Sequence, residues 1–287
     1  MPKAAYHLTR PERRTTAVVF ASPHSGRDYA WSFLRHTRLN EHSVRSSEDA
    51  YVDQLFESAP REGAPLLRAG APRAYVDLNR SPDELDPALI EGVARQGHNP
   101  RVASGLGVIP RVVANGRAIY SGKISLAEAR HRIDTCWRPY HEALQAQLDQ
   151  AHLMFGQAIL VDCHSMPHEA MDSVASRGLR RPEIVLGDRF GAAADGAIVD
   201  RIEAAFTRAG LVVTRNTPFA GAYITQAYGR PARGRHAVQI EIDRALYMNE
   251  RLIRPNGNFD AFRRLMRDVI RDIAEIGRAR AMPLAAE

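Results

Sequence analysis

The stretch AVVFASPHSGRDY, residues 17–29, joins a short apolar run to a turn that carries reactive side chains. Residues 17–21 have the length and the apolar content of a strand that is buried on both faces. The chain then turns at a Ser-Pro pair and presents His24 directly after it. A histidine in this place either belongs to a functional site or bonds the backbone of its own turn, and the rest of the sequence has to decide.

The composition is that of an ordinary globular protein. The chain has 287 residues, of which 45% are apolar and 25% are charged, enough for one large domain or two small ones. There is no run of eighteen apolar residues, and the first residues lack the apolar core of a secretory signal. We therefore expect a cytoplasmic protein without a membrane partner. The two cysteines, Cys136 and Cys163, form no zinc motif and are expected to be buried thiols.

The formal net charge of +6 raises the question of nucleic acid binding. The arginines are scattered, the basic clusters are short, and lysine occurs only as Lys3 and Lys123. We therefore expect no nucleic-acid partner, although a basic nucleic-acid-binding protein remains the alternative from another functional class. It predicts binding whose affinity falls steeply with salt. A net positive field also favours small anionic substrates.

Apolar runs of strand length alternate with helical patterns along the chain. Such alternation predicts one α/β domain over residues 1–287, in which helices flank a mixed, largely parallel central sheet in three layers. The strands are expected at 17–21, 73–76, 157–163, 183–187, 211–214 and 236–242.

Three helices are marked by their ends. One begins at Ser125, where Glu128 completes a capping box, and Pro139 is expected to kink it. A second begins near Asp195 and ends at Gly210. The third is the C-terminal helix, expected at about 258–278.

Polar side chains follow several of the predicted strands. In sheets of this kind, ligands bind beyond the carboxyl ends of the strands. A catalytic zinc needs three protein ligands and an open position, and two histidines with one carboxylate are a common set. His24 and His164 are the natural pair, and the carboxylate is expected from Glu48 or Asp49.

Each candidate also has a purely structural interpretation. Glu48 and Asp49 are suited to capping a helix N-terminus, and Arg80 could form a surface ion pair of little energetic value. Ser25 beside His24 forms no catalytic triad, because a Gly-x-Ser-x-Gly turn is absent. Asp162 is assigned to the strand face opposite His164 and is therefore not counted as a ligand.

Taken together, these segments resemble the N-formylglutamate amidohydrolase family over about residues 15–250. One segment, Asp-Leu-Asn-Arg, is also similar to zinc carboxypeptidases and aspartoacylases, which share this α/β plan. The matching pieces are SPHSG (22–26), ED (48–49) with VDxL (52–55), YVDLNR (75–80), IYSGK (119–123), PYH (139–141), DCHS (162–165), GAYIT (221–225) and QIE (239–241).

The resemblance implies a zinc-dependent hydrolase of a linear amide, with one zinc ion per chain and an anionic N-acyl amino acid as substrate. N-formyl-L-glutamate, an intermediate of histidine degradation, is the first candidate. The residues that the resemblance places in the site are the metal ligands His24, Asp49 and His164, the general base Glu241, and the substrate-binding residues Asn79, Arg80 and Tyr223.

The chain also departs from the family pattern. Ser47–Ala50 replaces an Asp-Thr-Asp-Trp segment, and the stretch between Arg80 and Ile119, which is expected to form part of the substrate wall, is different. The acyl amino acid therefore stays open, and a carboxypeptidase-like or aspartoacylase-like enzyme on another N-acyl amino acid or peptide is the alternative. Also open are the choice between Glu48 and Asp49, the metal in the cell, the oligomeric state, and the group that stabilises the oxyanion, for which the candidates are Lys123, His141 and Tyr223.

Overall fold

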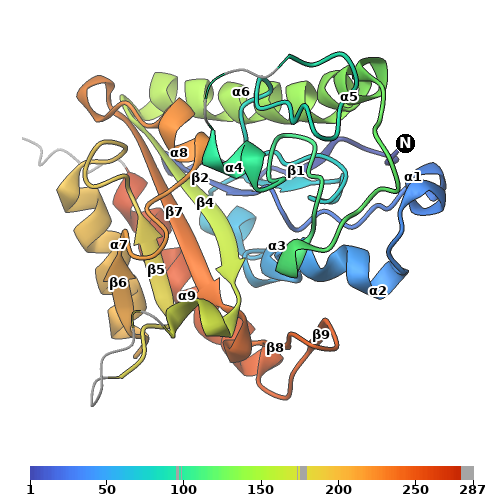
Figure 1. The fold of residues 1–287 in the computed structure, drawn as a ribbon. Helices are drawn as coiled ribbons and strands as arrows, with labels where there is room; N and C mark the ends of the chain where they lie inside the picture. The colour runs from blue at the N-terminus through green and yellow to red at the C-terminus, as the bar shows by residue number, and fades with distance from the viewer. Residues whose placement is uncertain (95–96, 98, 173, 175–179, 279–287) are drawn as a thin grey trace, which may run out of the picture.

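A computed structural model describes residues 1–94, 97, 99–172, 174 and 180–278, and a seven-stranded sheet runs through its middle (Figure 1). The strand order is β1-β3-β2-β4-β7-β5-β6. The pairs β2–β3, β2–β4, β4–β7 and β5–β6 are parallel, whereas β1–β3 and β5–β7 are antiparallel. The predicted α/β fold is confirmed. The strands are β1 (Tyr6–Thr9), β2 (Val18–Ser22), β3 (Leu66–Ala69), β4 (Ala158–Met166), β5 (Ile184–Gly187), β6 (Val213–Arg215) and β7 (Arg235–Asp243), with a separate hairpin of β8 (Met248–Asn249) and β9 (Arg254–Pro255).

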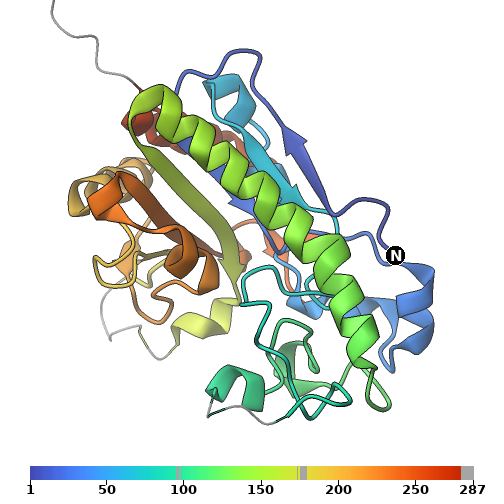
Figure 2. The same cartoon turned by 90° about the horizontal axis from the view of Figure 1, so that it is seen from above.

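Helices cover both faces of the sheet. Helix α6 packs on β2, β3 and β4 from one side, while α3, α7 and α9 pack together on the other side. Figure 2 shows α6 lying along the length of the sheet. The helices are α1 (Trp31–His36), α2 (Glu41–Val44), α3 (Val52–Leu55), α4 (Pro100–Ala103), α5 (Leu126–Arg132), α6 (Arg138–Phe155), α7 (Gly196–Arg208), α8 (Tyr223–Tyr228) and α9 (Phe259–Ala274).

The marked helix ends fall where the sequence predicts them. Ser125 accepts a hydrogen bond from the Glu128 amide, and Asp195 caps α7 in the same way. A π-helix over Ile133–Trp137 joins α5 to α6, directly before Pro139. In a regular helix the ring of Pro139 would meet the carbonyl four residues earlier, which lies inside this π-helix, so the irregularity relieves that clash. The kink itself stays a prediction.

One predicted strand is wrong. Residues 73–76 form a turn, closed by a hydrogen bond from the Tyr75 amide to the Pro72 carbonyl. The strand of this region is instead Leu66–Ala69, which the prediction missed, as it missed the edge strand Tyr6–Thr9. The other five predicted strands are present, with ends displaced by at most three residues.

The core lies in two layers, one on each face of the sheet. Along β4, Val161 and Cys163 face α7 and α9, whereas Leu160 faces α6. Because side chains alternate between the faces of a strand, Asp162 and His164 continue the face of Leu160. The expectation that Asp162 points away from His164 is therefore wrong, since residues two apart in a strand share one face.

The single-domain boundary stays a prediction. Both cysteines are buried free thiols, as expected. Among the residues that the structure describes, no helix is both long and apolar enough to cross a bilayer.

The turn after β2 depends on a close backbone approach at Gly26. A Cβ atom at this position would lie 2.1 Å from the Ala71 carbonyl oxygen, so the backbone would have to move. We expect Gly26→Ala to lower the free energy of unfolding by about 1–3 kcal/mol, measured by urea denaturation. Gly122→Ala is the control, because its added methyl group meets open space, and its effect should stay within about 0.5 kcal/mol. Equal stability of the two variants would contradict the close approach.

Candidate metal centre

His24 lies two residues beyond the carboxyl end of β2 and is buried. Its Nε2 lies 2.7 Å from Oδ1 of Asp77, and a protonated Nε2 donates a hydrogen bond to this carboxylate. Nδ1 of the same ring is buried and has no hydrogen-bond partner among the described residues, and it lies 3.4 Å from Oδ2 of Asp49. The histidine therefore presents an unused lone pair toward Asp49.

His164 lies on β4 and meets the same carboxylate from the other side. Its Nδ1 is 2.9 Å from Oδ2 of Asp49, and its ring centroid is 4.8 Å from that of His24. On its far side, Nε2 lies 3.0 Å from Oδ2 of Asp162 and 3.2 Å from Nδ2 of Asn79. Burial alone lowers the pKa of His164, but Asp162 and Asp49 outweigh it and raise that pKa well above its usual value.

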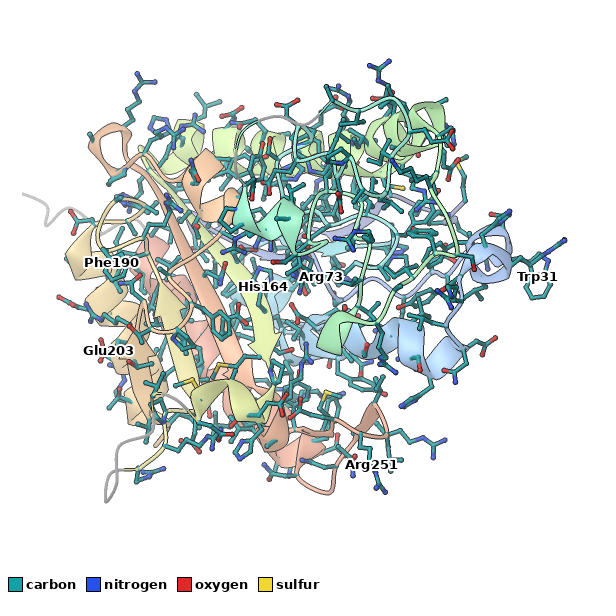
Figure 3. The ribbon with its side chains drawn as sticks, viewed as in Figure 1. Trp31, Arg73, His164, Phe190, Glu203 and Arg251 are labelled. Carbon is teal, nitrogen blue, oxygen red and sulfur yellow. The ribbon has the colours of Figure 1, made fainter. Side chains whose placement is uncertain are left out.

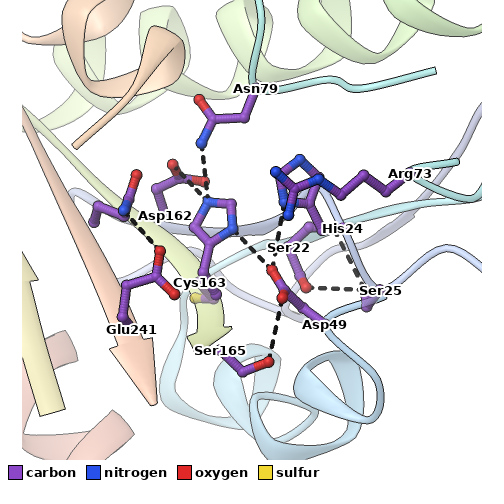
Figure 4. A network of polar contacts seen from close by, with 12 residues as sticks. Ser22, His24, Ser25, Asp49, Arg73, Asn79, Asp162, Cys163, Ser165 and Glu241 are labelled. Atoms are coloured by element: carbon purple, nitrogen blue, oxygen red, sulfur yellow. Dashed lines mark hydrogen bonds and ion pairs between the residues drawn. The ribbon is translucent and has the colours of Figure 1, made fainter. Parts of the chain in front are cut away.

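Asp49 is oriented by its neighbours so that one oxygen faces both histidines. Its backbone amide donates to the His24 carbonyl at 2.9 Å. Its Oδ1 accepts hydrogen bonds from Arg244 at 3.0 Å and from Ser165 at 3.2 Å. Oδ2 is thus left to the two imidazoles. Figure 4 shows Asp49 between Ser165 and His24.

The neighbouring acid, Glu48, is directed elsewhere. Its carboxylate accepts hydrogen bonds from Arg45 at 3.0 and 3.1 Å and from the Tyr29 hydroxyl at 2.7 Å. Of the two acids that the sequence left open, the structure brings Asp49 to the histidines.

The three side chains fit a divalent metal ion. One ligand atom each from His24, Asp49 and His164 lie within 4.8 Å of one another, and all three residues are buried. Burial alone would raise the pKa of Asp49, but the hydrogen bonds and charges of His164 and His24 lower it well below its usual value, so the carboxylate is ionised. Two imidazole nitrogens and a carboxylate suit zinc, and they accept other divalent ions as well.

These residues line a cavity of about 650 Å³ that opens at the carboxyl ends of the strands. Glu241, on β7, lines the same cavity and pairs in register with His164. Its Oε1 accepts a hydrogen bond from Gln239 at 2.9 Å. Burial is the main cause that raises the pKa of Glu241 to about 7; the charge of His164 opposes this shift and that of Asp49 adds to it.

The predicted substrate residues differ in their placement. Asn79 accepts a hydrogen bond from the Ile224 amide at 2.8 Å, so its side chain bridges His164 and α8. Arg80 lines the cavity, and its Nε and Nη1 donate to backbone carbonyls. The ring of Tyr223 packs against Trp137 and is not among the residues that line the cavity.

None of the three oxyanion candidates lines the cavity. Lys123 is exposed and donates to the Pro87 carbonyl, and His141 is held between the Leu78 carbonyl and the Tyr228 hydroxyl. The ring of Tyr223 packs against Trp137, outside the lining of the cavity.

Three arginines that the sequence reasoning missed do line the cavity, namely Arg73, Arg101 and Arg244. Arg73 donates from Nε to Asp77 at 3.0 Å, and Arg244 binds Asp49. Figure 3 places Arg73 and His164 close together near the middle of the molecule. Arg73 was missed because residues 73–76 were predicted to form a strand. Arg244 could have been found, because it directly follows β7, at the end of the sheet where the site residues gather.

Comparisons with known proteins all find relatives of the same kind. The sequence pattern of the family described as N-formylglutamate amidohydrolase matches residues 16–248. N-formylglutamate deformylases of Pseudomonas putida and Pseudomonas aeruginosa are 30% and 32% identical to this chain, over 81% and 74% of its length and 82% and 75% of theirs.

Solved structures extend the comparison. The crystal structure of N-formylglutamate amidohydrolase from Ralstonia eutropha JMP134 is 35% identical, with a TM-score of 0.88 over 95% of this chain and 98% of that one. A protein from Agrobacterium tumefaciens, 17% identical, with a TM-score of 0.66 over 96% of this chain and 97% of that one, shares the fold.

The contrast between Asp49 and Glu48 can be tested by metal binding. We expect Asp49→Asn to weaken zinc affinity by more than the roughly 10–100-fold that loss of an outer partner costs, because it removes the anionic oxygen between the histidines. Glu48→Gln, the matched control, should change the affinity only a few-fold. Competition with a chromophoric chelator measures both. The reverse ranking would make Glu48 the ligand.

Proposed function

The chain belongs to the N-formylglutamate amidohydrolase family, and we propose that it cleaves N-formyl-L-glutamate to formate and L-glutamate with one zinc ion per chain. Membership makes it an amide-bond hydrolase, and the names of its relatives support the substrate. One observation carries the proposal. The convergent atoms of His24, Asp49 and His164 lie in the same cavity as Glu241 and Arg80.

In this proposal the metal would be held by Nδ1 of His24, Nδ1 of His164 and Oδ2 of Asp49. A divalent ion there would lower the pKa of a water molecule to about 7 and would polarise a carbonyl. Asp77 accepts a hydrogen bond from Nε2 of His24, and Asp162 lies 3.0 Å from Nε2 of His164. A carboxylate in the place of Asp77 fixes the ring orientation of His24 and the tautomer in which its Nδ1 is unprotonated.

Glu241 acts as the general base and then as the general acid. It takes a proton from the attacking water and passes it to the amide nitrogen, which leaves as the amine of glutamate while the formyl carbon leaves as formate. Its position supports this role, because it lines the cavity beside His164 in the register of β4 and β7.

Arg73 and Arg80 take the charged groups of the reaction. As water attacks, negative charge develops on the amide oxygen, and a preorganised cation in the cavity stabilises it. Arg73 suits this role because Asp77 fixes its Nε while the residue lines the cavity. Arg80 binds the α-carboxylate, since two backbone carbonyls fix its guanidinium plane and this fork can bond both carboxylate oxygens.

Formate release tests the proposal directly. We expect the purified protein to release formate from N-formyl-L-glutamate, to lose this activity on chelation, and to regain it when zinc is added back. N-acetyl-L-aspartate and a blocked dipeptide in the same panel test the alternative enzymes. A zinc-loaded protein that cleaves one of these and not N-formyl-L-glutamate would contradict the proposed substrate.

The role of Glu241 predicts a separable defect. We expect Glu241→Gln to lower kcat by about 10²–10⁴-fold, because proton transfer is lost, and to leave the zinc content at one ion per chain. Glu142→Gln on the exposed face of α6 is the control and should match the wild type. If Glu241→Gln keeps its kcat, another group performs the proton transfer.

A further inference from the structure

The proposed substrate carries two carboxylates, and the mechanism above assigns a partner to only one. Glutamate has an α-carboxylate and a side-chain carboxylate two methylene groups farther on. Burying part of a charged ligand without a compensating partner is costly. The cavity should therefore offer a second cation at a short distance from Arg80.

Within the described residues, the cations that line the cavity are Arg73, Arg80, Arg101 and Arg244. Arg73 is paired with Asp77 at 3.0 Å. Arg244 is used by Asp49 at 3.0 Å and also donates to the Ser165 hydroxyl. The proposed mechanism already assigns Arg73 to the oxyanion, and Arg244 holds the carboxylate of Asp49, so neither is assigned to a second substrate carboxylate.

Arg101 stands beside Arg80 through a single intervening residue, Leu106. The Leu106 amide donates to the Arg101 carbonyl at 2.8 Å, and the Leu106 carbonyl accepts from Nε of Arg80 at 3.0 Å. The two charges also repel each other. Burial is the main cause that lowers the pKa of Arg80, and the charge of Arg101 lowers it further. No described residue forms an ion pair with Arg101.

The short helix that carries Arg101 is anchored to the rest of the cavity wall. Asn99 caps α4 by accepting from the Arg101 and Val102 amides. Arg111 donates to the Ala103 carbonyl at 3.2 Å and is itself held by Asp86 at 2.8 Å. These bonds set the backbone position of Arg101, whose exposed side chain reaches the cavity.

We propose that Arg101 binds the side-chain carboxylate of the substrate while Arg80 binds its α-carboxylate, so that Arg101 selects amino acids with an acidic side chain. This inference rests on the proposed function of the site. Its basis is that Arg80 and the backbone of Arg101 both bond Leu106, and that both arginines line the cavity that contains the candidate metal ligands.

Glu84 forms no ion pair with Arg101 among the described contacts. Glu84 acts on the charge of Arg80, but its carboxylate accepts from the Ser81 amide at 3.0 Å and from Asn99 at 3.4 Å. It lines a neighbouring cavity rather than the one that contains Arg101. The face of Arg101 toward the substrate therefore stays cationic.

The test compares two substrates of one shape, N-formyl-L-glutamate and the neutral N-formyl-L-glutamine, on the zinc-loaded full-length protein. We expect Arg101→Gln to lower kcat/KM for the glutamate substrate by about tenfold to a hundredfold, and to leave kcat/KM for the glutamine substrate within about twofold. Arg101→Lys should fall between, because it keeps the charge and loses the fork. Arg130→Gln, an exposed arginine of α5 outside the cavity, is the control.

The outcomes separate this inference from the proposed function. Equal losses on both substrates, or no loss on either, would overturn the role of Arg101 while the proposed function stands. If the wild type releases formate from neither substrate, the proposed function fails, and binding of L-glutamate and L-glutamine by calorimetry then decides. A defect of Arg101→Gln confined to L-glutamate supports the inference, and any other pattern overturns it.

Discussion

A row of buried carboxylate–imidazole contacts holds the site together. Asp77 contacts His24, Asp49 lies between His24 and His164, and Asp162 contacts His164. Three carboxylates gathered out of water repel one another and lose their hydration, and this arrangement is stable only where positive charge compensates it. Arg73 and Arg244 supply part of this charge, and a divalent ion at the centre would add to it and give Nδ1 of His24 a partner.

The parallel sheet supplies the rigidity that this row needs. Strands β2, β4 and β7 run side by side, so their carboxyl ends deliver residues to one edge. The register pairs Asp162 with Gln239 and His164 with Glu241. On one face of β4, Leu160 packs against α6, and the next residues on that same face are the functional residues Asp162 and His164. The same alternation that builds the core therefore aims the functional groups.

The sequence alone located five of the seven strands of the sheet, because buried strands carry a strong apolar signal. The resemblance placed His24, His164 and Glu241 in one site. The sequence could not choose between Glu48 and Asp49, which are adjacent at the start of a helix. Their distinction is made by Arg45 and Tyr29, which capture Glu48 through contacts that no local pattern encodes. The placement of the Tyr223 ring could not be predicted either, because its aromatic partners, Trp137 and His141, lie far away in the sequence.

The cations of the cavity wall are arginines, in a chain with only two lysines. Three of the four cavity arginines use part of the guanidinium for the protein itself: Arg73 holds Asp77, Arg80 holds two backbone carbonyls, and Arg244 holds Ser165, Asp49 and the Glu48 carbonyl. A lysine offers a single point charge and cannot fix a plane in this way. Arginine side chains thus serve at once as supports of the wall and as its positive charge. The basic character of the chain is accordingly expressed where carboxylates must be oriented, which is the requirement of a site for small anionic substrates.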